Sequence, residues 1–188
     1  MKKELNKSVK TIISAYCDAF QKYFTFSGRA SRYDFWAFRL FDTLVIFLLA
    51  VLTFLFTPLV VLIYVYNVAT IIPSLALLSR RLHDRGKSFW LWGAAILLAF
   101  FGLISNGINS YNSVKMGAGT IIFIIAMLFV LILSLYIFVQ TCLQGNGKDN
   151  KYGAPVEENS EYVSRGRWFM ITYLVIFVIS AILSKGFS

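Results

Sequence analysis

The sequence predicts an all-α, polytopic membrane helical bundle, and three observations carry that prediction. Hydrophobic residues make up 58% of the 188 residues and charged residues only 14%, which is more apolar surface than a soluble domain of this size can bury. The apolar residues run in stretches long enough to cross a bilayer, which takes about 20 helical residues. Basic residues exceed acidic ones by nine and gather between these stretches, as the positive-inside rule expects of membrane proteins.

Five apolar stretches are the expected membrane spans. The long run that begins at Leu40 exceeds one span and contains Pro58, so it is divided into two helices joined by a short turn at Thr57 and Pro58. The fifth stretch has 17 residues, at the short end of the range that can span. The four core spans are expected at about 38–57, 59–79, 89–105 and 120–142, and the fifth at about 168–184.

An amphipathic helix is expected near the N-terminus, over residues 2–24. Its apolar residues recur at steps of three and four, and lysines fill much of the remainder. Such a helix can lie in the membrane interface or pack on the protein's own cytoplasmic surface, and periodicity does not distinguish the two. The chain therefore divides into residues 1–25 for this helix, 26–156 for a four-span domain, and 157–188 for a polar linker and the fifth span.

Several residues mark the expected ends of helices. Ser31 followed by Asp34 has the spacing of a capping pair at a helix start. Gly86 suits a helix end, and Ser88 suits the N-cap of the following helix. Asn67 is the one strongly polar residue near the middle of the second span, and it is expected to bond to another helix.

The distribution of lysine and arginine predicts the orientation of the chain. Eight lie before the first span or, for Arg39, at its start, four lie between the second and third spans, and four lie between the fourth and fifth. Only two lie on the opposite side. Because basic residues accumulate on the cytoplasmic side, the N-terminus is expected in the cytoplasm and the C-terminus outside.

Three motifs lie on this expected cytoplasmic side. The central one, SRRLHDRGKSFW from Ser79 to Trp90, holds four cations, the one histidine and an aspartate. If the second helix continues through it, Arg80 and Asp84 become i, i+4 neighbours, while Asp34 and Asp84 are expected to pair with arginines from another helix end. The candidate site residues, called the motif cluster below, are Gly28, Arg29, Arg32, Asp34, Trp36, Arg80, Arg81, His83, Asp84, Arg85, Gly86, Ser88, Trp90, Gly145, Asn146, Gly147, Asn150, Tyr152 and Gly153.

The motifs together resemble a known family. They read GRASR with Phe35 and Trp36, then RRLHDRGKS with Trp90, then GNG followed by NKYGAP. In this order they resemble the domain-of-unknown-function-805 family of YhaH-like small bacterial inner-membrane proteins, over about residues 20–156. The resemblance implies a bacterial plasma-membrane protein with a four-helix core, and it implies no reaction. Two features depart from the family pattern, because Phe89 stands where glycine usually follows the serine and the fifth apolar helix is an addition.

Four functions are open for the motif cluster. The first is a cytoplasmic clasp, in which ion pairs hold the helix ends together. The second is binding of an anionic lipid headgroup or phosphate by the arginines, with Trp36 and Trp90 at the rim and the Gly145–Gly147 backbone as a nest. A membrane enzyme would use His83 as a base, but no carboxylate cluster, cysteine pair or nucleophile motif accompanies it. A transporter or channel would place ionisable groups inside the spans, where the sequence has almost none.

The sequence therefore predicts a structural or interaction component of the bacterial membrane rather than an enzyme. Neither a metal nor a cofactor is expected, because no ligand or nucleotide-binding pattern is present. The expected partners are membrane lipids, including anionic headgroups, and a membrane protein or a second copy of the chain. Nucleic acid is not expected, since the basic residues adjoin membrane spans rather than forming a separate domain.

Overall fold

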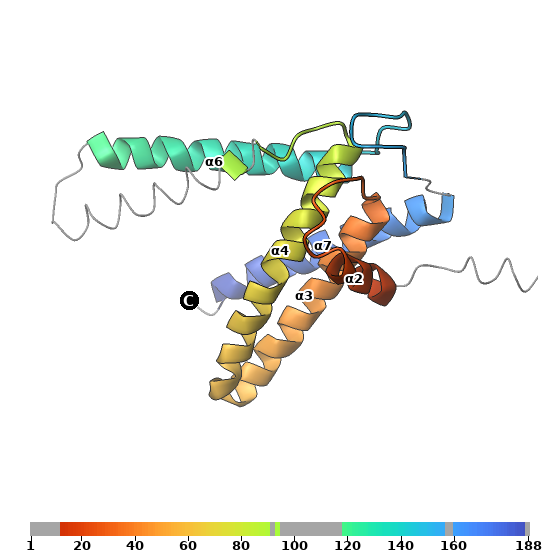
Figure 1. Cartoon of the computed structure of the whole chain (residues 1–188). Helices are drawn as coiled ribbons and strands as arrows, with labels where there is room; N and C mark the ends of the chain where they lie inside the picture. Colours follow the sequence, from red (N-terminus) through yellow and green to blue (C-terminus); the bar gives the residue numbers. More distant parts are fainter. Residues whose placement is uncertain (1–11, 91–92, 95–117, 157–159, 187–188) are drawn as a thin grey trace, which may run out of the picture. The chain divides into compact units, whose positions relative to one another are not determined.

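The computed structural model describes residues 12–90, 93–94, 118–156 and 160–186 (Figure 1). These residues are helical without a strand, which confirms the all-α prediction. The described residues up to Gly86 and from Gln144 onward form one compact unit, and those between form a second unit that is described by itself. The elements are α2 (Ile12–Gln21), α3 (Arg32–Leu55), the short 3₁₀ turn η1 (Thr57–Leu59), α4 (Val60–Asp84), α6 (Ala118–Cys142) and α7 (Ser160–Gly186).

Helices α3 and α4 form an antiparallel hairpin, as predicted for the first two spans. Helix α3 begins where the capping pair predicts: the backbone N–H of Asp34 donates to Ser31 Oγ at 3.0 Å, and the Ser31 hydroxyl donates to the Asp34 carboxylate at 2.9 Å. The helix ends at Leu55, and η1 with Pro58 at its start makes the tight reversal. A proline suits this position because the first turn of a helix needs no N–H at that point.

Helix α4 continues through the charged stretch to Asp84. It ends with the N–H of Arg85 donating to the Leu82 carbonyl at 3.0 Å and the N–H of Gly86 donating to the His83 carbonyl at 2.9 Å. Gly86 has a φ of +69°, a left-handed conformation that glycine adopts without strain and that commonly terminates helices. The predicted helix end at Gly86 is therefore confirmed, and Arg80 and Arg81 before it are helical.

Helix α2 packs on α3 and α4 through small residues and aromatic rings. Ala15 and Ala19 are buried, and the Tyr16 ring stacks on Phe38 with centroids 5.3 Å apart. In the turn after the helix, the Tyr23 hydroxyl donates to the Ala69 carbonyl at 2.8 Å. The described helix covers part of the predicted stretch 2–24, and residues 2–11 of that prediction lie outside the described residues.

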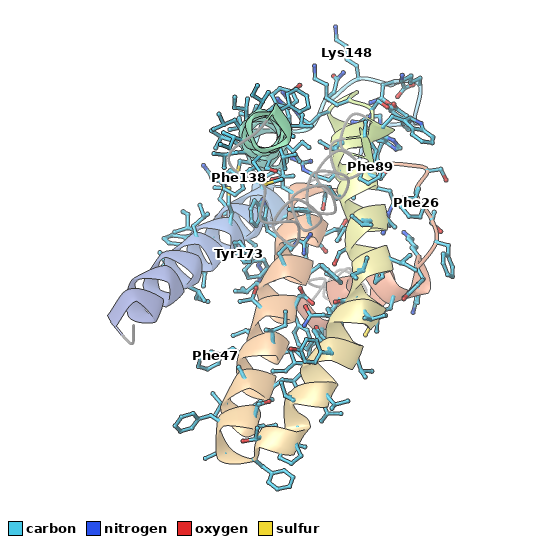
Figure 2. All side chains as sticks on the ribbon, turned by 90° about the vertical axis from the view of Figure 1, so that its left-hand side faces the viewer. Phe26, Phe47, Phe89, Phe138, Lys148 and Tyr173 are labelled. Carbon is cyan, nitrogen blue, oxygen red and sulfur yellow. The ribbon has the colours of Figure 1, made fainter. Side chains whose placement is uncertain are left out.

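Within the described residues, three helical segments are long and apolar enough to cross a membrane: Arg32–Leu55, Thr57–Asp84 and Ile124–Cys142, with mean hydropathies of 2.0 to 2.5. Large apolar side chains cover the outside of the hairpin, and Phe47 projects from α3 away from α4 (Figure 2). Its side chain is 66% exposed, and Phe54 is 90% exposed. An apolar exterior of this kind is stable in lipid rather than in water.

The predictions for the third and fifth spans have different outcomes. The third, 89–105, falls mostly outside the described residues. Helix α7 contains the fifth, 168–184, and begins eight residues earlier at Ser160; its crossing of a membrane stays a prediction. The expectation for Asn67 is wrong: its side-chain amide donates to the Ile63 carbonyl of its own helix at 2.8 Å, because the side chain lies on an exposed face.

Candidate functional site

Asp84, the last residue of α4, is the centre of the candidate site. Its Oδ1 accepts from Arg29 Nε at 2.9 Å, and its Oδ2 accepts from Arg81 Nη1 at 2.6 Å. The three side chains are 4%, 2% and 0% exposed, respectively. A buried carboxylate is stable only when such partners offset its loss of hydration, so this triad depends on all three side chains.

Arg29 connects the end of α4 to the loop that follows Gln144. Its Nη1 donates to the carbonyl oxygens of Lys148 at 2.9 Å and Gly153 at 3.2 Å, and its Nη2 donates to the carbonyl of Asn146. Arginine suits this position because its planar fork presents five donors in a fixed arrangement. One side chain thereby holds a carboxylate and three loop carbonyls together.

Gly145 and Asn146 close against the C-terminus of α4. The N–H of Asn146 donates to the Asp84 carbonyl at 2.9 Å, which satisfies one of the carbonyls that every helix end leaves without an intrahelical partner. A Cβ added at Gly145 would lie 2.8 Å from Asp84 Cγ. Only glycine therefore allows the loop to approach this carboxylate so closely.

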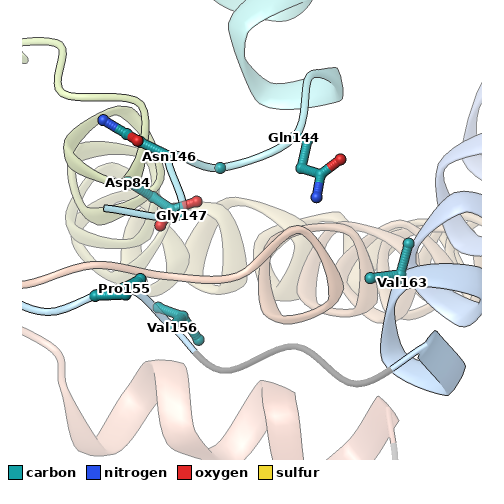
Figure 3. Close-up of a pocket in the computed structure, with 8 residues that line it drawn as sticks. Asp84, Gln144, Asn146, Gly147, Pro155, Val156 and Val163 are labelled. Atoms are coloured by element: carbon teal, nitrogen blue, oxygen red, sulfur yellow. The ribbon is translucent and has the colours of Figure 1, made fainter. Parts of the chain in front are cut away.

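A cavity of about 260 Å³ lies beside this contact (Figure 3). Asp84 and Asn146 stand on one side of it, and Val163 of α7 stands on the other. The described residues of its wall combine one charged group, the Asp84 carboxylate, with amide, glycine and aliphatic groups. The lining residues are Asp84, Gln144, Gly145, Asn146, Gly147, Pro155, Val156 and Val163.

His83 is held on three sides. Its Nδ1 lies 3.2 Å from the Gly28 carbonyl, its Nε2 lies 3.4 Å from Ser79 Oγ, and its ring stacks on Tyr152 with centroids 3.7 Å apart. Because a carbonyl can only accept, Nδ1 carries the proton in that contact. Asn150 adds a bond from its side-chain amide to the His83 carbonyl at 3.0 Å. The ring is thus built into the contact between α4 and the loop.

The other two arginines at the end of α4 are Arg80, inside the helix, and Arg85, directly after it. Arg80 Nε donates to the Ala76 carbonyl of its own helix at 3.3 Å, not to Asp84. The Nη2 of Arg80 is buried and makes no hydrogen bond to another described residue. Arg85 Nη1 donates to the Gln144 carbonyl at 2.6 Å. Because α4 continues to Asp84, Arg80 and Asp84 are i, i+4 neighbours as expected, but the ion pair that Asp84 makes within α4 is with Arg81, one residue closer.

Ten predicted residues meet at this end of α4, Gly86, Gly147 and Gly153 adjoin them, and the rest make other contacts. Asp34 contributes to the cap of α3, while Arg32 and Trp36 are buried on α3. Gly86 ends α4, and Gly147 lines the cavity. In the second unit, Ser88 Oγ accepts from the Trp90 N–H at 3.3 Å, and Trp90 is 84% exposed. The ten that meet are Gly28, Arg29, Arg81, His83, Asp84, Arg85, Gly145, Asn146, Asn150 and Tyr152, with the Gly153 carbonyl bound by Arg29.

A second cluster of hydrogen-bonded side chains, formed by Tyr16, Asp42 and Tyr66, was not predicted from the sequence. The Tyr66 hydroxyl donates to Asp42 Oδ1 at 2.9 Å, and the Tyr16 hydroxyl lies 3.0 Å from that of Tyr66. Burial raises the pKa of the Tyr16 phenol. These bonds link α2, α3 and α4. The only sequence signal was a single acidic residue inside the first apolar stretch, and its tyrosine partners carry no distinguishing pattern.

Comparison with known proteins places the motif cluster within a shared region. A family model described as "Protein of unknown function (DUF805)" matches residues 23–154. The inner membrane protein YhaI of Escherichia coli strain K12 is 32% identical over 115 residues, which is 55% of this chain and 97% of that relative. The protein of the same name from Escherichia coli O157:H7 matches equally. No solved structure matches. With the family model covering more than half of its length, the chain belongs to the DUF805 family of membrane proteins.

Proposed function

We propose that this protein is a structural or interaction component of the bacterial cell membrane, and that its motif cluster is a cytoplasmic clasp. The clasp joins the end of α4, the segment before α3 and the loop 144–153. One observation carries the proposal: the Asp84 carboxylate is buried between the guanidinium groups of Arg29 and Arg81. Arg29 also donates hydrogen bonds to carbonyl groups of the loop. The triad therefore fixes the position of the loop as well as that of the helix ends.

We further propose four core spans, with α7 as a fifth, and a cytoplasmic N-terminus. The excess of lysine and arginine before α3, after α4 and before α7 supports this orientation. The C-terminus then lies outside. A reporter fused after Ser188 that is accessible only from the cytoplasm would contradict the five-span arrangement.

We propose no catalytic role for the motif cluster. The two candidates for acid or base chemistry are His83 and Asp84, and both are committed to structural contacts. The His83 ring contacts Gly28, Ser79 and Tyr152, and both Asp84 oxygens accept from arginines. A general base needs a lone pair within reach of the proton that it removes, and these contacts already engage the ring nitrogens of His83 and both carboxylate oxygens of Asp84.

A double-mutant cycle tests the clasp. Arg29→Gln and Asp84→Asn are made singly and together in the full chain, and the free energy of unfolding is measured in detergent micelles. We expect a coupling energy of about 1.5 kcal/mol or more, in the range of contacting charged pairs. The matched cycle uses Lys148→Gln and Asp149→Asn, whose side chains are exposed, and is expected to give little coupling. Equal coupling in the two cycles would refute the clasp.

Binding of an anionic headgroup or phosphate is the alternative, and it rests on the exposed lysines of the same loop. Lys148 and Lys151 are exposed, and the Lys151 ammonium lies 5.0 Å from the centre of the Tyr152 ring. Arg29 and Arg81 contribute little to such a site because they face Asp84. Retention of phosphatidylglycerol by purified protein tests this alternative. A loss in the Lys148→Ala, Lys151→Ala double variant with unchanged unfolding would favour it over the clasp.

A further inference from the structure

We infer that one face of α3, formed by Tyr33, Trp36 and Ala37, is a helix-recognition surface. Helix α7 of the same chain binds to this surface. Side-chain packing, rather than the covalent link between α7 and the rest of the chain, holds the helix there. The surface takes a helix that presents an aromatic face with a small residue at the crossing point. Aromatic side chains stand one turn before that residue and one and two turns after it.

The residues of α7 that meet α3 recur at helical spacing. Tyr162, Gly166, Phe169 and Tyr173 follow steps of four, three and four. Residues at such steps lie on one face of a helix. This face, called the α7 stripe below, runs along α7 from its first turn.

Three aromatic contacts join the α7 stripe to α3. The Tyr33 ring meets Tyr162 edge-on, with centroids 5.1 Å apart, and meets Phe169 at 5.3 Å. The Trp36 ring meets Tyr173 at 5.5 Å. Tyr33 and Trp36 are each only 2% exposed. Edge-to-face and tilted rings at these distances attract beyond simple contact, so the pairs select for aromatic residues at the three positions.

Gly166 sets how closely the two helices approach. A Cβ added there would lie 3.1 Å from the backbone nitrogen of Tyr33 and 3.3 Å from its Cα. These are backbone atoms of a helix, so they cannot move aside independently. A small residue at a crossing point lets two helix backbones approach each other closely. A larger side chain at this position separates the helices and breaks all three aromatic contacts together.

The recognition surface on α3 lies inside the region that the family model matches, and α7 lies outside that region. Tyr33, Trp36 and Ala37 fall inside the matched region, which ends at residue 154, whereas α7 begins at Ser160. The YhaI proteins are matched over 97% of their length by 55% of this chain. The shared core thus carries the recognition surface, and this chain supplies a helix for it from its own C-terminal addition.

The test cuts the connection and asks whether α7 stays bound. A protease site is inserted between Val156 and Ser160 of the full chain, the protein is cleaved in mild detergent, and α7 is captured by a C-terminal tag. We expect the fragment ending at Val156 to be captured with it. Gly166→Leu should abolish most of that capture. Trp168→Leu is the control on the same helix, because Trp168 is 65% exposed, and it should leave capture unchanged.

Three outcomes would overturn the inference. They are separation of the two fragments without any substitution, an equal loss in both variants, and capture of a differently tagged second copy instead of the attached core. A second measurement uses the uncut chain, with a photoreactive phenylalanine replacing Tyr173. It should crosslink to α3, and Gly166→Leu should remove the crosslink. A crosslink that survives Gly166→Leu would also overturn the inference.

Discussion

Replacing Tyr23 with phenylalanine removes a single hydroxyl group, which donates a hydrogen bond to a backbone carbonyl in α4. Pro73 lies inside α4 and has no N–H, so the carbonyl of Ala69, four residues earlier, lacks its regular helical donor. The Tyr23 hydroxyl donates to this carbonyl at 2.8 Å from the turn after α2. This bond therefore gives the Ala69 carbonyl a donor in place of the missing helical N–H, and it also connects the turn after α2 to α4.

The expected loss follows from where the carbonyl lies. An acceptor left without a partner costs about 1–3 kcal/mol when water cannot reach it, and the bilayer offers no water in its core. Tyr23 is only half-buried, so the lower part of that range applies, about 1–2 kcal/mol. The aromatic ring stays in place, since phenylalanine keeps the contact with Phe20, whose ring centre lies 6.2 Å away.

The assay is a second cycle, in which Tyr23→Phe is made in the natural chain and in Pro73→Ala. Alanine restores an N–H at position 73, which can donate to the Ala69 carbonyl within the helix. We expect Tyr23→Phe to lower the free energy of unfolding in the natural chain and to have little effect in Pro73→Ala. An equal loss in both backgrounds would refute the reasoning, because the hydroxyl would then act somewhere other than at Ala69.

Three further substitutions test the site and its supports. Asp84→Asn should lower the free energy of unfolding by about 3–5 kcal/mol, because it leaves two buried guanidinium groups without their carboxylate; thermal melts compare it with the exposed Asp149→Asn, and a loss of equal size in both would count against the triad. Gly145→Ala should lower it by about 1–3 kcal/mol through overpacking against Asp84. Gly147→Ala, with no atom within 4 Å of its added Cβ, should be mild by comparison, and reversal of that order would contradict the close approach. Ser31→Ala should lower it by about 1 kcal/mol through loss of the cap of α3, and an unchanged melt would argue that Asp34 alone sustains the helix start.

The sequence predicted the local features of this fold well. The Ser31 cap, the reversal at Pro58 and the end of α4 at Gly86 each depend on a few adjacent residues, and all three are confirmed. The prediction that Asp84 would pair with an arginine from another helix end is also confirmed, in Arg29. Topology alone suggested this meeting, because it brings charged loops to one side of the membrane.

Tertiary features were less accessible from the sequence. Asp84 can pair with a residue three or four positions before it on α4, so Arg81 and Arg80 are both possible partners. Which of the two pairs with Asp84 depends on the direction of the side chains in the last turn of the helix. The α7 stripe was hidden because the apolar stretch in α7 is hydrophobic on all sides, so periodicity does not show which face packs. The bond between Tyr66 and Asp42 depends on the register of the α3–α4 hairpin, which no local pattern specifies.

Arg29 holds the loop 144–153 much as a bound cation would, by collecting main-chain oxygens from several points. Its three loop acceptors are the backbone carbonyls of Asn146, Lys148 and Gly153. None of these bonds depends on which side chain the residue carries. The loop can therefore change its exposed residues, and with them the surface that it presents to solvent, while its path stays the same. Variation is expected at exposed positions such as Lys148 and Asp149 across related chains, while the arginine that holds the loop is kept.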